Sequence, residues 1–156
     1  MKYIGLAFAI GSLFVFVRLY IGSLKRQRLC YAEISRLLSY IDEHLRTERA
    51  PLSELCRSFR CGELAECGFF ELAFDEGKAD EGAERLLMDS GDKERLKEFL
   101  FSFGSGYLDT EIKRTSLIAE HFRKRNEEEA KESNDKIRVA LLLFCSFALA
   151  LALLCV

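Results

Sequence analysis

The sequence has no tryptophan, a single proline and only two histidines among its 156 residues. One proline leaves long stretches without a helix breaker, and the strand-like alternation of apolar and polar residues is missing, so we expect an all-α fold. The two histidines, His44 and His121, are far apart in the sequence and lie outside any metal-binding or catalytic motif. The sequence therefore favours a non-enzymatic protein and predicts no catalytic, cofactor-binding or metal-binding residue.

Charged residues are also absent from two apolar runs, Tyr3 to Val17 and Val139 to Val156. A helix as long as the second run measures about 27 Å, close to the thickness of the hydrocarbon core of a membrane. We therefore expect transmembrane helices at residues 1–21 and 139–156. For the first run an uncleaved anchor is favoured over a signal peptide, because no Ala-x-Ala cleavage spacing follows it.

Basic residues predict the orientation of these two helices. They follow the first apolar run and precede the second, at Arg18, Lys25, Arg26 and Arg28 and at Arg123, Lys124, Arg125, Lys131, Lys136 and Arg138. Lys and Arg next to membrane helices stay in the cytoplasm during insertion. The sequence thus predicts a two-pass protein of the cell membrane whose central part is cytosolic.

The central part is acidic and has a helical pattern. It contains all 25 Asp and Glu but lacks Lys2 and Arg18, so its acidic residues exceed its basic ones by four. This balance argues against a nucleic-acid partner, which would require a basic surface. Roughly 115 residues are enough for one hydrophobic core. We expect a cytosolic antiparallel bundle of about five or six helices at residues 22–122, followed by a charged helical stalk at residues 123–138.

Helical periodicity locates the main elements of this bundle. A long amphipathic helix is predicted from Leu24 to Arg49 by the apolar residues Cys30, Ile34, Leu37, Leu38, Ile41 and Leu45. Asp89 to Asp92 is predicted as a turn, and Gly104 to Gly106 as the break before a helix that Asp109 caps. No strong breaker follows, so that last helix should continue through residues 139–156.

Charge and expected exposure indicate three surfaces on which a partner protein could bind. They are the acidic stretch Asp75 to Glu84, the loop Gly104 to Asp109 and the stalk around Glu127 to Glu132. A solvated stalk without a partner is the alternative for the third surface. The candidate residues are Asp75, Glu76, Asp80, Glu81, Gly104, Asp109, Glu127, Glu128 and Glu129.

Three of the six cysteines, Cys56, Cys61 and Cys67, are close together in the sequence, and His44 could approach them in a bundle. Their spacings do not match the Cys-x-x-Cys pairs that zinc prefers, and a cytosolic domain keeps its thiols reduced. We expect buried or idle thiols, with a cysteine-based metal or redox sensor as the alternative.

Several short motifs occur in a defined order along the chain. Ala50-Pro51-Leu52-x-Glu54 follows the first amphipathic helix, Phe103-Gly104 precedes Asp109, and Glu128-Glu129-Ala130 precedes Lys136-x-Arg138. In this order the sequence resembles stage III sporulation protein AB of endospore-forming bacteria along essentially its whole length. The residues that carry the resemblance are Pro51, Leu52, Glu54, Phe103, Gly104, Asp109, Glu129 and Ala130.

The resemblance implies a function as well as a fold. In that family the soluble part is similar to the cytoplasmic helical domain of the type II secretion platform protein, the F component. It implies a subunit of the channel complex that joins the mother cell and the engulfed forespore, placed in the mother-cell membrane around the forespore. The implied partners are a secretion-type ATPase, other membrane subunits of the channel and the lipid bilayer. Where the family usually has Gln four residues after the Asp, this chain has Lys113.

Two alternatives stay open on the residues alone. A membrane-tethered helical adaptor of another secretion platform would have the same fold but a different gene neighbourhood. The cysteine-based sensor would differ from both in binding metal or in losing function when its thiols are replaced. A homo-oligomer is compatible with the sequence, which does not fix the number of copies.

Overall fold

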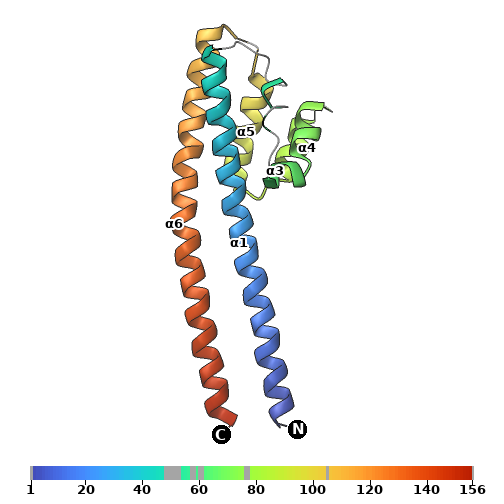
Figure 1. The fold of residues 1–156 in the computed structure, drawn as a ribbon, viewed down its shortest axis with the longest axis vertical. Coiled ribbons are helices and arrows are strands. Elements are labelled where there is room, and N and C mark those ends of the chain that lie inside the picture. The colour runs from blue at the N-terminus through green and yellow to red at the C-terminus, as the bar shows by residue number, and fades with distance from the viewer. Residues whose placement is uncertain are drawn as a thin grey trace. The chain divides into compact units, whose positions relative to one another are not determined.

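The computed structural model describes residues 2–47, 54–56, 59, 62–75, 78–104 and 106–155. Its elements in chain order are α1 (Lys2–Thr47), α3 (Gly62–Glu66), the π-helix η1 (Glu71–Asp75), α4 (Ala79–Glu84), α5 (Ser90–Ser102) and α6 (Leu108–Cys155) (Figure 1). Within the described ranges every element is helical and no strand occurs. The predicted all-α class is confirmed.

Two compact units divide the chain, and α1 and α6 contribute residues to both. Unit 1 consists of Met1–Arg26 and Ala130–Val156, and unit 2 consists of Gln27–Glu129. The predicted boundaries of the anchors, bundle and stalk do not coincide with this division. They stay predictions.

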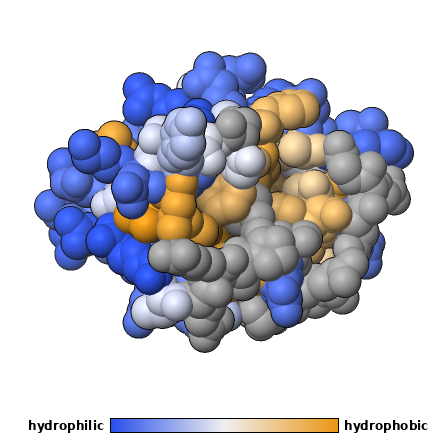
Figure 2. All heavy atoms as spheres, turned by 90° about the horizontal axis from the view of Figure 1, so that it is seen from above, coloured by the Kyte–Doolittle hydropathy of each residue, from blue (hydrophilic) through white to orange (hydrophobic). Residues whose placement is uncertain are grey.

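Unit 2 contains the hydrophobic core. The apolar face predicted for the first helix is buried in full: Cys30, Ile34, Leu37, Leu38, Ile41 and Leu45 are at most 5% exposed. Leu96 and Phe99 of α5 and Ala119 and Phe122 of α6 are buried in the same unit. Seen from above (Figure 2), hydrophobic side chains gather towards the middle of the face, with hydrophilic ones around them. Burial of an amphipathic face thus stabilises the helices that carry the candidate residues.

Unit 1 is an antiparallel pair formed by the first part of α1 and the last part of α6. The rings of Phe14 and Phe144 lie 6.1 Å apart, and Figure 1 shows both chain ends at the same end of the pair. Most of the large hydrophobic residues that the structure leaves exposed belong to this unit, among them Phe8, Phe16, Leu142 and Leu153. Among the described residues, no helix combines the length and the apolar composition that crossing a membrane requires. The flanking transmembrane helices therefore stay a prediction.

Two helix starts differ from the sequence prediction. Ser90, Gly91 and Asp92 were expected in a turn but form the first turn of α5, after Asp89 as N-cap. Similarly, α6 begins at Leu108, so Asp109 lies inside its first turn and does not cap it. The Tyr107 carbonyl accepts the backbone N–H groups of Thr110 and Glu111 at 2.9 and 3.0 Å. Asp109 still places a negative charge where the helix dipole favours one.

Gly62 opens the short helix α3 where a side chain from another helix caps it. Its backbone has φ +60°, and a Cβ there would lie 1.6 Å from Oε1 of Glu33. The Glu33 carboxylate accepts the N–H groups of Glu63 and Leu64 at 3.1 and 2.9 Å, which ties α3 to α1. The glycine is needed both for its left-handed backbone and for the approach of this carboxylate.

We expect Gly62→Ala to lower the free energy of unfolding by about 1–3 kcal/mol, because it strains the backbone and displaces the capping carboxylate. Gly91→Ala is the matched control, since a Cβ at this helical glycine meets open space. That variant should be neutral or more stable by about 0.5 kcal/mol. Urea unfolding followed by circular dichroism measures both. Equal stability of the two variants would contradict the role assigned to Gly62.

Candidate functional site

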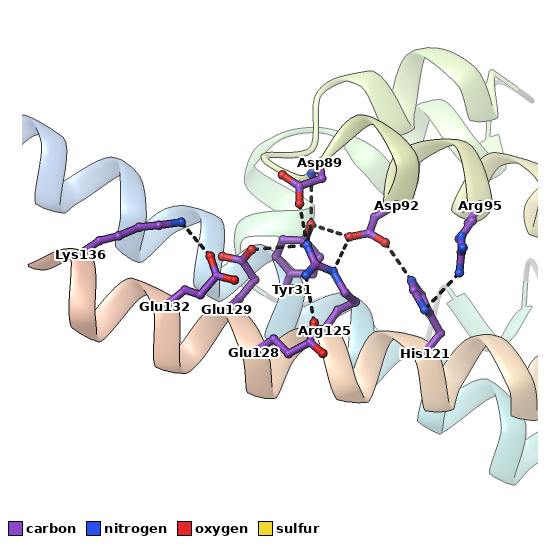
Figure 3. Close-up of polar contacts among 10 residues, drawn as sticks. All are labelled: Tyr31, Asp89, Asp92, Arg95, His121, Arg125, Glu128, Glu129, Glu132 and Lys136. Carbon is purple, nitrogen blue, oxygen red and sulfur yellow. Dashed lines mark hydrogen bonds and ion pairs between the residues drawn. The ribbon is translucent and has the colours of Figure 1, made fainter.

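A group of charged and polar side chains joins α1, α5 and α6 within unit 2 (Figure 3). At its centre is Asp92, which is only 6% exposed. The Tyr31 hydroxyl donates to Asp92 Oδ2 at 2.8 Å, and Arg125 Nε donates to the same oxygen at 2.9 Å. His121 Nε2 lies 2.8 Å from Asp92 Oδ1. We call the Asp92 cluster the set Tyr31, Asp89, Asp92, His121, Arg125, Glu128 and Glu129.

Arg125 connects the remaining acids of the cluster. Its Nη1 lies 3.0 Å from Glu128 Oε2, its Nη2 lies 3.5 Å from Glu129 Oε1, and Nη2 also donates to Asp89. With Asp92 this makes four carboxylates around one guanidinium. The guanidinium carbon also lies 5.5 Å from the centre of the Tyr31 ring. Such charge-assisted bonds are about twice as strong as neutral ones, and the planar fork of arginine suits several at once.

The contacts of His121 assign its tautomer. Arg95 Nη1 lies 3.3 Å from His121 Nδ1, and a guanidinium can only donate. Nδ1 is therefore the acceptor, and Nε2 carries the proton that is donated to Asp92. His121 thus extends the cluster from the buried carboxylate to an exposed arginine on α5.

Hydrogen bonding decides the charge state of Asp92. Burial acts to raise the pKa of this carboxyl, but hydrogen bonds from His121, Arg125 and Tyr31 outweigh burial and hold the pKa below its usual value. Burial raises the pKa of Tyr31, which keeps its hydroxyl protonated as a donor. The hydrogen bond to Asp92 raises the pKa of Arg125 still further above its usual value. At neutral pH Asp92 is therefore a carboxylate, Arg125 is a cation and Tyr31 is a neutral donor.

Acid should destabilise the fold through Asp92. The pKa of this group is lower in the folded state than its usual value of 3.8, so its contribution is fully present above that value. The contribution is lost as the pH falls through the lowered pKa of the folded state. We expect the urea midpoint of the protein to fall more steeply below about pH 4 than that of Asp92→Asn, which cannot titrate there. Parallel pH profiles for the two proteins would contradict this assignment.

Among the described residues, the side-chain hydrogen bonds of His121 are those to Asp92 and Arg95, and no serine, threonine or cysteine is bonded to it. No group of three or more His, Cys, Asp or Glu among the described residues is placed to hold a metal ion. What the geometry does provide is a set of buried polar bonds that fixes three helices against one another.

Five of the acidic candidates and Gly104 lie on exposed parts of the described chain. Asp80 and Glu81 are exposed in the first turn of α4, and Asp109 is exposed in that of α6. Gly104 follows α5 with φ +83° and is exposed. On α6, Glu127 and Glu128 are exposed. The expected exposure therefore holds at these six positions.

Glu129 differs from the other stalk candidates because it is only 6% exposed and belongs to the Asp92 cluster. Its neighbour Ala130 is half-buried, and Phe103 packs beside Phe99 with their rings 5.4 Å apart. Of the remaining candidates, Asp75 ends η1, whereas Glu76 lies outside the described residues. Glu129 is thus placed to hold the fold together and not to meet a partner directly.

Three further residues carry the family resemblance, and one of them lies in the described part of the chain. Pro51 and Leu52 lie outside the described residues, and Glu54 is exposed in the helical stretch 54–56. His44, considered with the cysteines, donates through Nδ1 to the Tyr40 carbonyl of its own helix at 3.0 Å.

Three of the described cysteines, Cys30, Cys56 and Cys67, are free thiols with little reactivity. Cys30 and Cys56 are buried, and burial raises the pKa of each to about 12. Burial also raises the pKa of Cys67, which is half-buried. Because the thiolate is the reactive form, these groups are poor nucleophiles at neutral pH. Cys61 lies outside the described residues.

Sequence reasoning missed the centre of the Asp92 cluster. The sequence prediction placed Tyr31 within the helix Leu24 to Arg49, Asp92 in a turn and Arg125 in the charged stalk. One signal was available: His121 and Arg125 are four residues apart, which places both on the face of α6 that flanks the buried Phe122.

Comparison with family models, with curated proteins and with solved structures gave no match to the chain.

Proposed function

We propose that this chain is a non-enzymatic membrane subunit of a secretion-like channel, of the sporulation type that its sequence resembles. In this proposal the helical part, residues 22–122, is a cytosolic bundle that docks a secretion-type ATPase. The segments 1–21 and 139–156 anchor the chain in the mother-cell membrane around the forespore and contact other membrane subunits of the channel. Copies of the chain could also associate with one another.

The contrast between the two units is the observation that carries this proposal. Unit 2 buries an apolar core, whereas unit 1 leaves large apolar side chains in the open. Phe8 is 81% exposed, Leu19 69% and Leu142 68%. Apolar surface on this scale is unfavourable in water and favourable against lipid or another apolar helix. The basic residues that flank these segments support a cytosolic position for the part between them.

Exposed acids on unit 2 support the docking of a protein partner. Asp80, Glu81, Glu127 and Glu128 are solvent-accessible and lie on helices held by the core. Among the described residues, Glu128 forms a salt bridge with Arg125 at 3.0 Å, and Asp80 interacts electrostatically with Lys97. Accessible charges of one sign increase the rate at which a complementary surface associates. A basic surface on the ATPase would therefore be the expected counterpart.

The test is binding of the full chain, in phosphatidylcholine nanodiscs, to the purified secretion-type ATPase encoded nearest its gene. We expect saturable binding, weakened about tenfold or more by Asp80→Lys with Glu81→Lys or by Glu127→Lys with Glu128→Lys. Glu43→Lys reverses an exposed charge on α1 and serves as the control. Absence of binding between folded partners would contradict the docking role. Recovery of the chain in the soluble fraction after alkaline carbonate extraction of membranes would contradict the anchoring.

A further inference from the structure

A shallow, open cavity of about 330 Å³ lies in unit 2 between α5 and α6. Apolar and basic side chains line it together: Phe99, Leu117 and Ile118, and Arg95, Arg114 and His121. A single acid, Glu98, is also part of the lining. Concave sites that bind ligands typically combine an apolar surface with a few polar groups in this way.

Arg95 is the basic group best placed to bind an anion. Its Nη1 donates to His121 Nδ1 at 3.3 Å, which uses one of five N–H donors. In the described ranges Arg95 has no carboxylate partner, and its side chain is exposed. His121 is itself held by the buried Asp92 at 2.8 Å, so Arg95 is attached to a fixed support. A guanidinium with free donors on a fixed support is suited to a carboxylate.

Arg114 contributes a second positive charge on the α6 side of the cavity. Its Nη2 donates to the Ser102 hydroxyl, and its Nη1 lies 3.9 Å from a buried acid, Glu111. The longer of these contacts is a weak ion pair, and the side chain is 43% exposed. The two arginines therefore outnumber the single acid of the lining, and the cavity favours a negative group.

Leu117 gives the cavity its accessible apolar surface. The residue is 68% exposed, although it is large and lies one residue before the half-buried Ile118. Phe99, which is 5% exposed, is buried beneath the same cavity. Arginine is enriched among the residues that dominate the energy of protein–protein contacts, and an exposed leucine beside it adds apolar surface that a partner can cover. The apolar part of the cavity is therefore suited to a bulky aliphatic or aromatic side chain of a partner.

We propose that this cavity binds a segment of a partner protein that presents a carboxylate next to a bulky apolar side chain. The carboxylate pairs with Arg95, and the apolar side chain covers Leu117 and Ile118. A phosphate ligand fits less well, because Glu98 would repel its second charge and neither a helix N-terminus nor a glycine-rich loop lines the cavity. The proposal does not rest on ATPase docking, since the acids assigned to that role lie outside the cavity.

Methyl NMR of the full chain in phosphatidylcholine nanodiscs tests the site directly. The probe is the capped peptide Leu-Glu-Phe-Ala-Leu, which carries one carboxylate, and its neutral counterpart is Leu-Gln-Phe-Ala-Leu. We expect the acidic peptide to shift the methyl resonances of Leu117 and Ile118 in a saturable way, while those of the buried Ile34 stay in place. The neutral peptide should bind about tenfold more weakly, because it cannot pair with Arg95.

Two variants and two controls make the result specific. Arg95→Gln and Leu117→Ser should each weaken binding of the acidic peptide about tenfold or more. Arg36→Gln removes an exposed positive charge from α1, and Leu87→Ser removes an exposed leucine outside the cavity, so both should bind normally. Equal affinity for the two peptides, equal losses in Arg95→Gln and Arg36→Gln, or no saturable shift would each overturn the proposal. Displacement of the acidic peptide by inorganic phosphate at a similar concentration would assign the cavity to phosphate instead.

Discussion

Replacing Arg125 by methionine is expected to lower the free energy of unfolding by about 3–5 kcal/mol, the range found when one partner of a buried ion pair is removed. In the Asp92 cluster, Arg125 contacts all four carboxylates. One of them, Asp92, is buried at the centre of the cluster. Without the arginine, Asp92 would keep only the bonds from Tyr31 and His121. The remaining acids would also repel one another without a compensating charge.

The position of the charge, and not its sign alone, should determine this loss. Arg123→Met removes the same charge from an exposed site two residues away on α6 and should change stability by no more than about 0.5 kcal/mol. Arg125→Lys keeps the charge but lacks the planar fork, so its loss should be intermediate. Urea unfolding of the full chain in nonionic detergent, followed by the near-ultraviolet circular dichroism of tyrosine, measures all three. A similar loss in Arg123→Met and Arg125→Met would show that net charge is responsible and not the cluster.

The long helices of the fold follow from local signals and could be predicted. The apolar spacing of Ile34, Leu37 and Ile41 identifies one face of a helix, and the structure buries all three. The end of α5 could also be predicted, because a glycine, Gly104, follows it. Glycine readily takes the left-handed backbone conformation that is found there. The start of α5 was missed. Asp89-Ser90-Gly91-Asp92 has the composition of a turn, yet the same residues are suited to an N-cap and the first turn that follows it.

The Asp92 cluster could not be predicted in the same way, because its bonds join residues that are distant in sequence. Tyr31 and Asp92 are separated by 61 positions, and Asp92 and Arg125 by 33. From the sequence alone, a charged residue on a polar helix is expected to be exposed to solvent. Its burial can be recognised only when the packing of the other helices is known. Glu129 illustrates this: Glu127 and Glu128 before it are exposed, whereas Glu129 is buried and pairs with Arg125 in unit 2. The cavity beside Arg95 depends on the same packing and was missed for the same reason.

Removing the ring of Phe122 is the other change expected to have a large effect. Phe122 is fully buried, and its ring lies 6.5 Å from the Tyr31 ring and 5.3 Å from the His121 ring, measured between centroids. Phe122→Ala should lower the free energy of unfolding by about 3–5 kcal/mol through lost apolar burial and the cavity left behind. The variant should also loosen Tyr31 and His121, which the ring supports from α6.

Leu117→Ala provides the matched control for Phe122→Ala, because it shortens a large apolar side chain on the same helix where 68% of the residue is exposed. We expect a change of no more than about 0.5 kcal/mol in stability, measured by the same urea unfolding. Binding of the acidic peptide from the cavity experiment should also distinguish the two variants, with the larger effect in Leu117→Ala. At a urea concentration where both are folded, Leu117→Ala should bind it more weakly than Phe122→Ala does. A large loss of stability in Leu117→Ala would mean that this leucine belongs to the core, and that its accessible surface is not available for a partner.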